Sequence, residues 1–227
     1  MRPDLRDQVL AANLALPQHG LVTLTWGNAS GIDRGEGVVV IKPSGVAYDE
    51  MTAEDMVVVD LDGNPAGSGD RPPSERYIHT CIYRARPDVQ AVVHTHQHWA
   101  TVMGIGDAPI LPILHVQGEL VEEGVPLWPH AMLVTDDKLG NDMAEALGKH
   151  RALHLQGHGI VTVSDSLEKA TIDAIHLEQL AKANWRVLAM GRKPRVIPKD
   201  ELSQRMATGV GWEVRWAYYR QLAGLDA

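Results

Sequence analysis

The sequence predicts an α/β protein in which a central, mostly antiparallel β-sheet is flanked by helices. Helix-like and strand-like patterns are interspersed along the 227 residues, and few of them form the strict strand–helix–strand units that build a parallel sheet. Hydrophobic residues make up 44% and charged residues 22% of the chain, as in ordinary globular proteins. Neither a repeat nor a long linker interrupts the chain, so we expect one domain over residues 1–227.

The amino-terminal part is expected to begin with a helix and to continue as strands. Apolar residues recur at helical spacing over residues 3–15, and Gly20 lies beyond the end of this helix. The small residues 27–31 and the Gly- and Pro-rich residues 64–73 are expected to be loops. Apolar runs predict three strands, at residues 21–26, 38–41 and 56–61.

In the middle of the chain a helix is expected between a residue that favours a helix start and one that favours a helix end. Ser74 is a suitable N-cap, the residues after it carry an apolar stripe at helical spacing, and Pro87 closes the helix. Apolar runs then predict three further strands, at residues 89–94, 110–116 and 132–135.

The carboxy-terminal part is expected to be mainly helical. A short helix at residues 139–147 leads into an apolar, strand-like stretch at residues 154–163. Asp165 and Glu168 have the spacing of a capping box, which begins a helix that runs to about Met190. The tail after Pro198 is expected to be helical as well.

Composition excludes several classes of protein. A formal net charge of -8 argues against nucleic-acid binding, which needs clustered Lys and Arg. No run reaches the roughly 18 apolar residues of a membrane span, and the first residues lack the apolar core of a signal peptide. Cys81 is the only cysteine, so an intramolecular disulfide is impossible. We therefore expect a cytoplasmic protein without a membrane or nucleic-acid partner.

Three histidines have the spacing and surroundings of metal ligands. Alternate residues of a strand share one face, so His94 and His96 are expected to project together from the end of the apolar run before them. His158 stands between two glycines, which let the backbone approach whatever the ring binds. Three neutral imidazoles suit zinc, or manganese and iron if a carboxylate joins them.

A blander explanation of the histidines stays open. A pair of histidines two residues apart is more often simply two polar residues at a strand end, and a chain with eleven histidines forms some pairs by accident. Seven others are expected to be ordinary surface or core residues: His79, His98, His115, His130, His150, His154 and His176.

Three short loops have residues that suit a phosphate group. Residues 26–30 and 42–45 each follow a predicted strand and mix glycine with short hydrogen-bond donors, while residues 72–75 open a helix. Backbone N–H groups in such loops and at helix N-termini bind anions. Each loop taken alone is equally well explained by ordinary turn chemistry, or by a good helix cap. Glu75, in the first turn, would suit the helix dipole without any catalytic role.

Taken together and in this order, the motifs resemble those of the class II aldolase/adducin family. They are LTWGNAS, IKPSGV, PPSERYIH, AVVHTHQHWA and QGHGIV, and the resemblance extends from about Leu5 to Gln221. The family includes fuculose- and rhamnulose-phosphate aldolases and ribulose-5-phosphate 4-epimerases. The resemblance implies a three-layer α-β-α fold, with helices on both sides of the sheet, and a metal-dependent activity in carbohydrate metabolism.

The resemblance also implies roles for particular residues. His94, His96 and His158 match the three zinc ligands, and Mn²⁺ or Co²⁺ are alternatives to Zn²⁺. Glu75 matches the acid/base near the metal. Family members are typically four-fold symmetric homotetramers, in which Tyr219 would act on a neighbour's metal. Five residues match positions around the substrate phosphate or beside it: Asn28, Lys42, Ser44, Gly45 and Ser74.

Two departures from the family pattern bear on the reaction. Pro73 replaces a phosphate-side serine, and residues 114–118 contain no match for the catalytic Asp of the epimerases, with Glu119 out of register. Glu75 is Glu, as in the aldolases, whereas the epimerases carry Asp. We therefore expect an aldolase that cleaves a ketose phosphate or related hydroxy-carbonyl compound. The alternatives are a 4-epimerase, which the TWGNAS, IKPSGV and AYYRQ strings favour, and a decarboxylase of a keto or hydroxyaromatic acid. A non-enzymatic adducin-like module is disfavoured, because all three histidines and Glu75 are retained.

Overall fold

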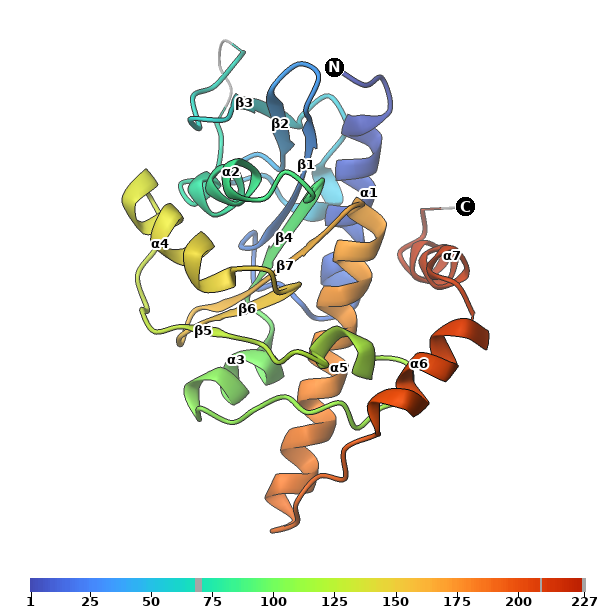
Figure 1. Cartoon of the computed structure of the whole chain (residues 1–227). Coiled ribbons are helices and arrows are strands. Elements are labelled where there is room, and N and C mark those ends of the chain that lie inside the picture. Colours follow the sequence, from blue (N-terminus) through green and yellow to red (C-terminus); the bar gives the residue numbers. More distant parts are fainter. Residues whose placement is uncertain (68–70, 209, 226–227) are drawn as a thin grey trace.

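A seven-stranded sheet forms the middle layer of the structure, a computed structural model that describes residues 1–67, 71–208 and 210–225 (Figure 1). The strand order is β3-β2-β1-β4-β7-β6-β5. β5 pairs with β6 in parallel, and the other neighbouring pairs are antiparallel, so the predicted fold class is confirmed. The strands are β1 (Asn28–Asp33), β2 (Val38–Ile41), β3 (Val57–Asp60), β4 (Ala91–Thr95), β5 (Leu127–Trp128), β6 (Ala152–Leu155) and β7 (Gly159–Ser164).

Helices cover both faces of this sheet (Figure 1). On one face lie α1 (Leu5–Gln18), α3 (His98–Ile105) and α5 (Leu167–Ala189). On the other face α2 (Arg76–Ala85) packs against α4 (Asp137–Leu147). Two short 3₁₀ helices, η1 (Tyr48–Glu50) and η2 (Gly118–Val121), lie in connecting segments. The chain ends in α6 (Lys199–Thr208), which contacts η2, and α7 (Trp212–Leu222), which packs against α1 and α5. Among the described residues, no helix has the length and apolar character needed to cross a bilayer.

Alternation along the strands divides the core into two clusters. Val93 and Ile160 face α1, α3 and α5, whereas their neighbours Val92 and Val161 face α2 and α4. All four side chains are fully buried. Burial on both faces explains why the central strands read as continuous apolar runs in the sequence.

The predictions of a strand at residues 21–26 and of a loop at residues 27–31 are wrong. Residues 21–26 contain a tight turn, in which Trp26 N–H donates to the Thr23 carbonyl at 3.0 Å. The strand in this part of the chain is β1, which begins inside the segment that was predicted to be a loop. Its small residues serve helix packing, because a Cβ on Gly31 would lie 2.8 Å from Leu5 Cδ1 and 3.1 Å from Leu167 Cδ1. A small residue at this position lets two helices approach the strand closely, and a single sequence does not distinguish such a position from a turn.

Two other predicted strands, at residues 110–116 and 132–135, are absent, since both segments are irregular. In each segment a backbone group bonds to a side chain, and neither segment pairs with a neighbouring strand. Leu111 exchanges hydrogen bonds with the Asn184 side chain on α5, and Val134 N–H donates to Glu75. The sheet is completed by the two-residue β5, which the sequence did not signal.

Three smaller corrections concern helix starts and turns. Ser166, rather than Asp165, caps α5, since its hydroxyl accepts the Lys169 N–H. Ser74 does not cap α2, which begins at Arg76 after Glu75 as the N-cap residue. The stretch at residues 154–163 is two antiparallel strands, β6 and β7, joined by a turn that contains His158. α3 was not predicted.

Candidate metal centre and substrate pocket

His94 and His96 lie where β4 ends, and their rings face each other. His94 is the fourth residue of β4 and is 1% exposed, whereas His96 follows the strand. The Nδ1 atom of His94 lies 3.0 Å from the Ile160 carbonyl oxygen, to which it donates, so Nε2 carries a lone pair. That Nε2 lies 3.0 Å from the Nε2 of His96. The sequence prediction that the two imidazoles project together agrees with this geometry.

His158 reaches the same point from the turn between β6 and β7. Its ring centroid lies 5.0 Å from that of His94 and 4.9 Å from that of His96. The turn is tight because Gly157 has a positive φ of 64°. A Cβ on Gly159 would overlap the Thr95 carbonyl oxygen, so only glycine lets β7 approach β4 this closely. Both ring nitrogens of His158 are buried and have no hydrogen-bond partner in the part of the chain that the structure describes.

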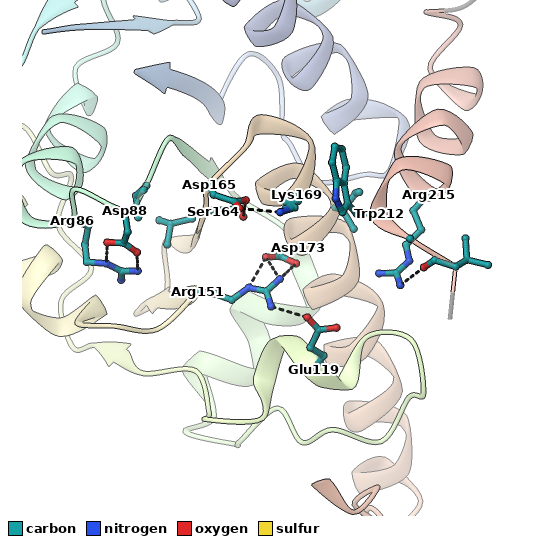
Figure 2. A pocket seen from close by; sticks show the side chains of 15 residues that line it. Arg86, Asp88, Glu119, Arg151, Ser164, Asp165, Lys169, Asp173, Trp212 and Arg215 are labelled. Atoms are coloured by element: carbon teal, nitrogen blue, oxygen red, sulfur yellow. Dashed lines mark hydrogen bonds and ion pairs between the residues drawn. The ribbon is translucent and has the colours of Figure 1, made fainter. Parts of the chain in front are cut away.

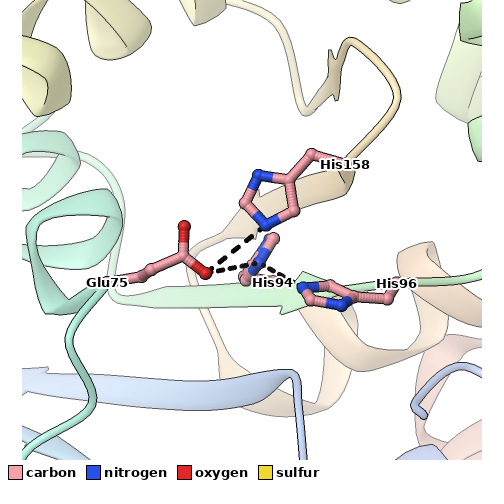
Figure 3. A group of neighbouring side chains, drawn as sticks. All are labelled: Glu75, His94, His96 and His158. Carbon is pink, nitrogen blue, oxygen red and sulfur yellow. Dashed lines mark hydrogen bonds and ion pairs between the residues drawn. The ribbon is translucent and has the colours of Figure 1, made fainter. Parts of the chain in front are cut away.

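Glu75 completes the group from the start of α2 (Figure 3). Its Oε1 atom accepts the Val134 N–H at 3.0 Å, and its Oε2 atom lies 3.4 Å from His158 Nε2 and 3.8 Å from His94 Nε2. Burial raises the pKa of Glu75, but its contacts with His158 and His94 outweigh burial and bring the pKa to about 2. Glu75 is therefore ionised at neutral pH.

The four side chains suit a divalent cation. One ligand atom from each lies within 4.8 Å of the others. Ligand atoms on a tetrahedral ion, with bonds of about 2.0–2.1 Å, lie about 3.3 Å apart, so small side-chain movements would close the group around an ion. Burial lowers the pKa of His94 well below its ordinary value and also lowers the pKa of His96, which keeps the imidazoles neutral and able to ligate. His158 Nε2 lies 3.4 Å from Glu75 Oε2 but forms no hydrogen bond with the described residues, so it is available as a ligand.

A cavity of about 570 Å³ opens beside Glu75, His96 and His158. The three predicted loops form much of its wall, and the five residues matched to the phosphate region line it: Asn28, Lys42, Ser44, Gly45 and Ser74. Pro73 lines it as well, so the departure from the family pattern falls inside the pocket. The structure thus brings together every predicted site residue except Tyr219.

Lys42 lies in this wall but uses its donors inside the protein. The side chain is 2% exposed, and its ammonium group donates to the carbonyls of Thr25, Pro43 and Val46. These three bonds match the three N–H groups of a lysine. Burial lowers the pKa of Lys42 to about 8. Lys42 therefore links the loop that contains Thr25 to the one that contains Pro43 and Val46, and its charge lies on the protein side of these loops.

Tyr219 lies outside the pocket within this chain. It is 8% exposed, and its ring meets that of His19, the C-cap residue of α1, edge-on at 4.8 Å. Tyr218, the preceding residue, is 56% exposed. Glu119 is also elsewhere, bonded to Arg151 at 3.2 Å.

The sequence interpretation missed two parts of the pocket. Leu133 lines it and is 57% exposed, and Trp26, quoted only as part of a loop, lines it with 54% of its surface exposed. The Val134 N–H that holds Glu75 was also missed, because a backbone donor leaves no trace in residue type. No motif marks Leu133, which the fold brings to the pocket from a distant segment.

A second cavity, of about 530 Å³, lies at the opposite ends of β4 and β7 (Figure 2). Three of the cations in its wall form ion pairs: Arg151 with Asp173 at 2.7 Å, Lys169 with Asp165 at 2.9 Å, and Arg86 with Asp88. Arg215 donates instead to the Val210 carbonyl oxygen. Because most charges in this wall compensate one another, the group formed by Glu75, His94, His96 and His158, which could hold a metal ion, is the more distinctive candidate site.

Comparison with known proteins gives consistent matches. The family model described as Class II Aldolase and Adducin N-terminal domain matches residues 7–185. The L-ribulose-5-phosphate 4-epimerase UlaF of Salmonella paratyphi C (strain RKS4594) is 36% identical over 210 residues, covering 87% of this chain and 90% of that protein. Among solved structures, an L-fuculose 1-phosphate aldolase superposes with a TM-score of 0.80 at 28% identity, covering 90% of this chain and 95% of the other. The l-fuculose-1-phosphate aldolase of Thermus thermophilus gives a TM-score of 0.72 at 27% identity, covering 86% of this chain and 100% of the other.

Proposed function

Because the chain belongs to the class II aldolase and adducin family, we propose that it is a divalent-metal enzyme that epimerises a ketose phosphate such as L-ribulose 5-phosphate. The observation that carries the proposal is the meeting of three imidazoles and Glu75 beside an open cavity. The choice of epimerisation over the aldolase reaction that we expected from the sequence rests on the epimerase relatives, which match nearly the whole chain.

His94, His96 and His158 are the proposed ligands of Zn²⁺, with Mn²⁺ or Co²⁺ as alternatives. When bound, the ion would polarise a carbonyl or hydroxyl oxygen and stabilise negative charge that develops on it. The protein's part is to hold neutral, preoriented rings, as His94 is held by the Ile160 carbonyl. Such preorganisation avoids reorganisation at the moment of reaction.

Glu75 is the proposed acid/base. Its Oε1 is fixed by Val134 N–H, while Oε2 faces the histidines and the cavity. An ionised carboxylate held in this way can take a proton from a substrate hydroxyl and return it in the reverse step. The carbon–carbon bond next to the resulting alkoxide can then break, which turns the alkoxide into an aldehyde and leaves the bond's electron pair on the fragment that keeps the ketone. The bond can re-form on the other face of the aldehyde, which inverts that carbon.

The loops across the cavity are the proposed phosphate subsite. Asn28, Ser44, Gly45 and Ser74 offer short side chains and backbone, and the charge of Lys42 lies behind them. Pro73 contributes no N–H to this wall. We expect phosphate to bind there through neutral donors, assisted by the buried charge.

Tyr219 is the proposed catalytic tyrosine of a neighbouring subunit in a homotetramer. This role requires α7 to present Tyr219 to another copy of the chain, although its ring packs on α1 in the isolated subunit. Gel filtration with light scattering tests the tetramer, and mixing Tyr219→Phe with His96→Ala subunits tests sharing. Recovery of activity on mixing is expected, whereas two variants that never complement contradict a shared site.

The aldolase reaction is the second candidate. Glu75 is Glu, as in the aldolases that the sequence resembles, and the fuculose-phosphate aldolase structure matches at a TM-score of 0.80. Both reactions break the carbon–carbon bond between the α and β carbons of the ketone, and the two differ in whether the fragments leave the site.

One assay separates these reactions. The metal-loaded protein is incubated with L-ribulose 5-phosphate or L-fuculose 1-phosphate, and products are identified by NMR. Epimerisation gives the 4-epimer without free aldehyde, and aldol cleavage releases an aldehyde. Keto and hydroxyaromatic acids are included to detect release of carbon dioxide. Turnover of neither sugar phosphate with any of the three metals would overturn the proposal.

A further inference from the structure

Tyr48 joins two of the loops that form the proposed phosphate subsite. It opens η1, which follows the pocket loop at residues 42–45, and its hydroxyl reaches the loop that contains Trp26 and Gly27. The hydroxyl donates to the Gly27 carbonyl oxygen at 2.7 Å, and the Trp26 carbonyl oxygen is a second acceptor at 3.3 Å. Carbonyl oxygens can only accept, and burial raises the pKa of Tyr48, so the hydroxyl keeps the hydrogen that it donates.

The ring of Tyr48 also contacts the buried charge of the subsite. The Lys42 ammonium group lies over this ring, 4.8 Å from its centroid, which is within the range of a favourable cation–π contact. Lys42 itself donates to the carbonyl of Thr25, the residue before the two that Tyr48 holds. Three consecutive carbonyls, those of residues 25–27, are therefore held by two side chains from the segment 42–48.

Holding these carbonyls also fixes the N–H groups of the same loop. A peptide unit is planar, so a fixed carbonyl sets the direction of the N–H group of the next residue. For the carbonyls of Trp26 and Gly27, these are the N–H groups of Gly27 and Asn28, two residues that line the cavity. Gly27 has a positive φ of 97°, a conformation that glycine permits but does not enforce. Tyr48 therefore removes a freedom that glycine would otherwise leave in the cavity wall.

The Tyr48 side chain is itself anchored in the protein core. It is buried and belongs to the core cluster that contains the apolar side chains of α1, and η1 contacts α1. An anchor of this kind holds the loop in one position before any ligand arrives. Preorganisation reduces the entropy that is lost when a ligand binds.

We propose that Tyr48 is a positioning residue of the phosphate subsite, which acts through the carbonyls of Trp26 and Gly27 without touching the substrate. Tyr48 does not line the cavity, whereas both residues that it holds do. The proposal rests on the proposed function, because it takes the group that binds to these loops to be a phosphate.

Tyr48→Phe isolates the effect of the hydroxyl, because it keeps the ring that lies under Lys42. Tyr83→Phe is the matched control. It removes another buried tyrosine hydroxyl, which donates to the Ser30 carbonyl oxygen of β1, and Tyr83 does not line the cavity. Circular dichroism and thermal unfolding establish that both variants are folded.

The first measurement is a calorimetric titration of the metal-free proteins with inorganic phosphate, in which no metal ion can bind the anion. Tyr48→Phe should bind phosphate about tenfold more weakly than the wild type, and Tyr83→Phe should stay within twofold of it. The second measurement is the kinetics of the zinc-loaded proteins with L-ribulose 5-phosphate. Tyr48→Phe should raise KM about tenfold and leave kcat within twofold, because the metal ligands and Glu75 are unchanged.

Two results would overturn the role of Tyr48 and leave the proposed function standing: equal phosphate affinities of Tyr48→Phe and the wild type, or equal losses in Tyr48→Phe and Tyr83→Phe. A wild type that binds no phosphate would overturn both. Should Tyr48→Phe fail to fold, ¹H–¹⁵N NMR of the metal-free wild type takes its place. Phosphate should then shift the amide signals of Gly27 and Asn28, and binding that leaves them unmoved would contradict the proposal.

Discussion

At the scale of single residues, the site depends on groups whose protonation is set by their neighbours. His94 is held with Nδ1 as donor by the Ile160 carbonyl, which leaves Nε2 to ligate. Glu75 is held by one backbone N–H and stays ionised beside the imidazoles. Each group has one anchored atom and one atom that faces the site, which is the arrangement expected of ligands and catalytic groups that must not reorient.

The carboxylate can be tested with a change that keeps its shape. Glu75→Gln retains an oxygen for Val134 N–H but removes the charge and the ability to take up a proton. Because general acid–base catalysis contributes about 10²–10⁴-fold, we expect kcat to fall by about 10²-fold or more, with secondary structure unchanged. Steady-state kinetics and circular dichroism measure the two quantities.

The control for this change is Glu145→Gln, a similar neutralisation at an exposed position of α4. It should leave kcat within twofold of the wild type. A Glu75→Gln enzyme as fast as this control would show that Glu75 has no part in proton transfer.

At the scale of elements, glycine and other small residues explain both the success and the failure of the sequence interpretation. The glycines around His158 were read as permitting a close approach, and Gly159 does allow β7 to meet Thr95 of β4. The same reasoning failed at residues 27–31, which lie mostly on a strand, where Gly31 makes room for Leu5 of α1 and Leu167 of α5. The amino-acid type fixes how much space is needed, but only the tertiary structure says what occupies it.

Most elements and the metal cluster were predictable because their signals are local. Periodicity predicted α1 and α2, and the capping-box spacing of Asp165 and Glu168 predicted α5. The rings of His94 and His96 do meet as their spacing predicted, although β4 ends at Thr95, between them. Leu133 and Val134 join the pocket through an irregular segment that has no periodicity. Contacts made by an irregular segment depend on the course of the whole chain, so no periodicity or motif in a single sequence predicts them.

Gly159→Ala tests the close approach of β4 and β7. The new Cβ would overlap the Thr95 carbonyl oxygen and lie 3.2 Å from His96 Cδ2, so the strands must separate. We expect the free energy of unfolding to fall by about 1–3 kcal/mol and zinc affinity to weaken. Urea denaturation and competition with a chelator measure these effects.

Gly106→Ala provides the comparison, because the nearest atom to its Cβ is the Val102 carbonyl oxygen at 3.5 Å. It should change both quantities little. Equal effects of the two substitutions would contradict the packing argument.

The start of α5 offers a direct choice between the capping predicted from sequence and the capping found. Ser166→Ala removes the hydroxyl that accepts the Lys169 N–H and should cost about 1 kcal/mol. Asp165→Ala removes an exposed ion pair with Lys169, worth about 0.3–0.5 kcal/mol. Both are measured by urea denaturation, and a larger loss in Asp165→Ala would favour the original capping box.

At the scale of the whole molecule, the candidate metal site brings together segments that are far apart in the chain. Glu75 comes from α2, His94 and His96 from the end of β4, and His158 from the turn between β6 and β7. These four side chains come together only in the folded chain, so a complete site for an ion exists only there. Binding should therefore stabilise the native state by mass action.

Thermal unfolding measures this coupling. Zinc at about 100 times its Kd should add about 2.7 kcal/mol, or about 5–10 °C in Tm for a chain of this size. Removal with a chelator should reverse the shift. His96→Ala is expected to lose it, while His115→Ala, at an exposed position outside the cluster, should keep it. An equal shift in both variants would place the ion elsewhere.

The most direct measurement of the metal centre is the anomalous scattering of crystals grown with zinc. The account predicts one strong peak per chain, about 2.0–2.1 Å from the Nε2 atoms of His94, His96 and His158 and beside Glu75. A crystal with no peak among these side chains, or with its zinc bound only at other residues, would contradict it.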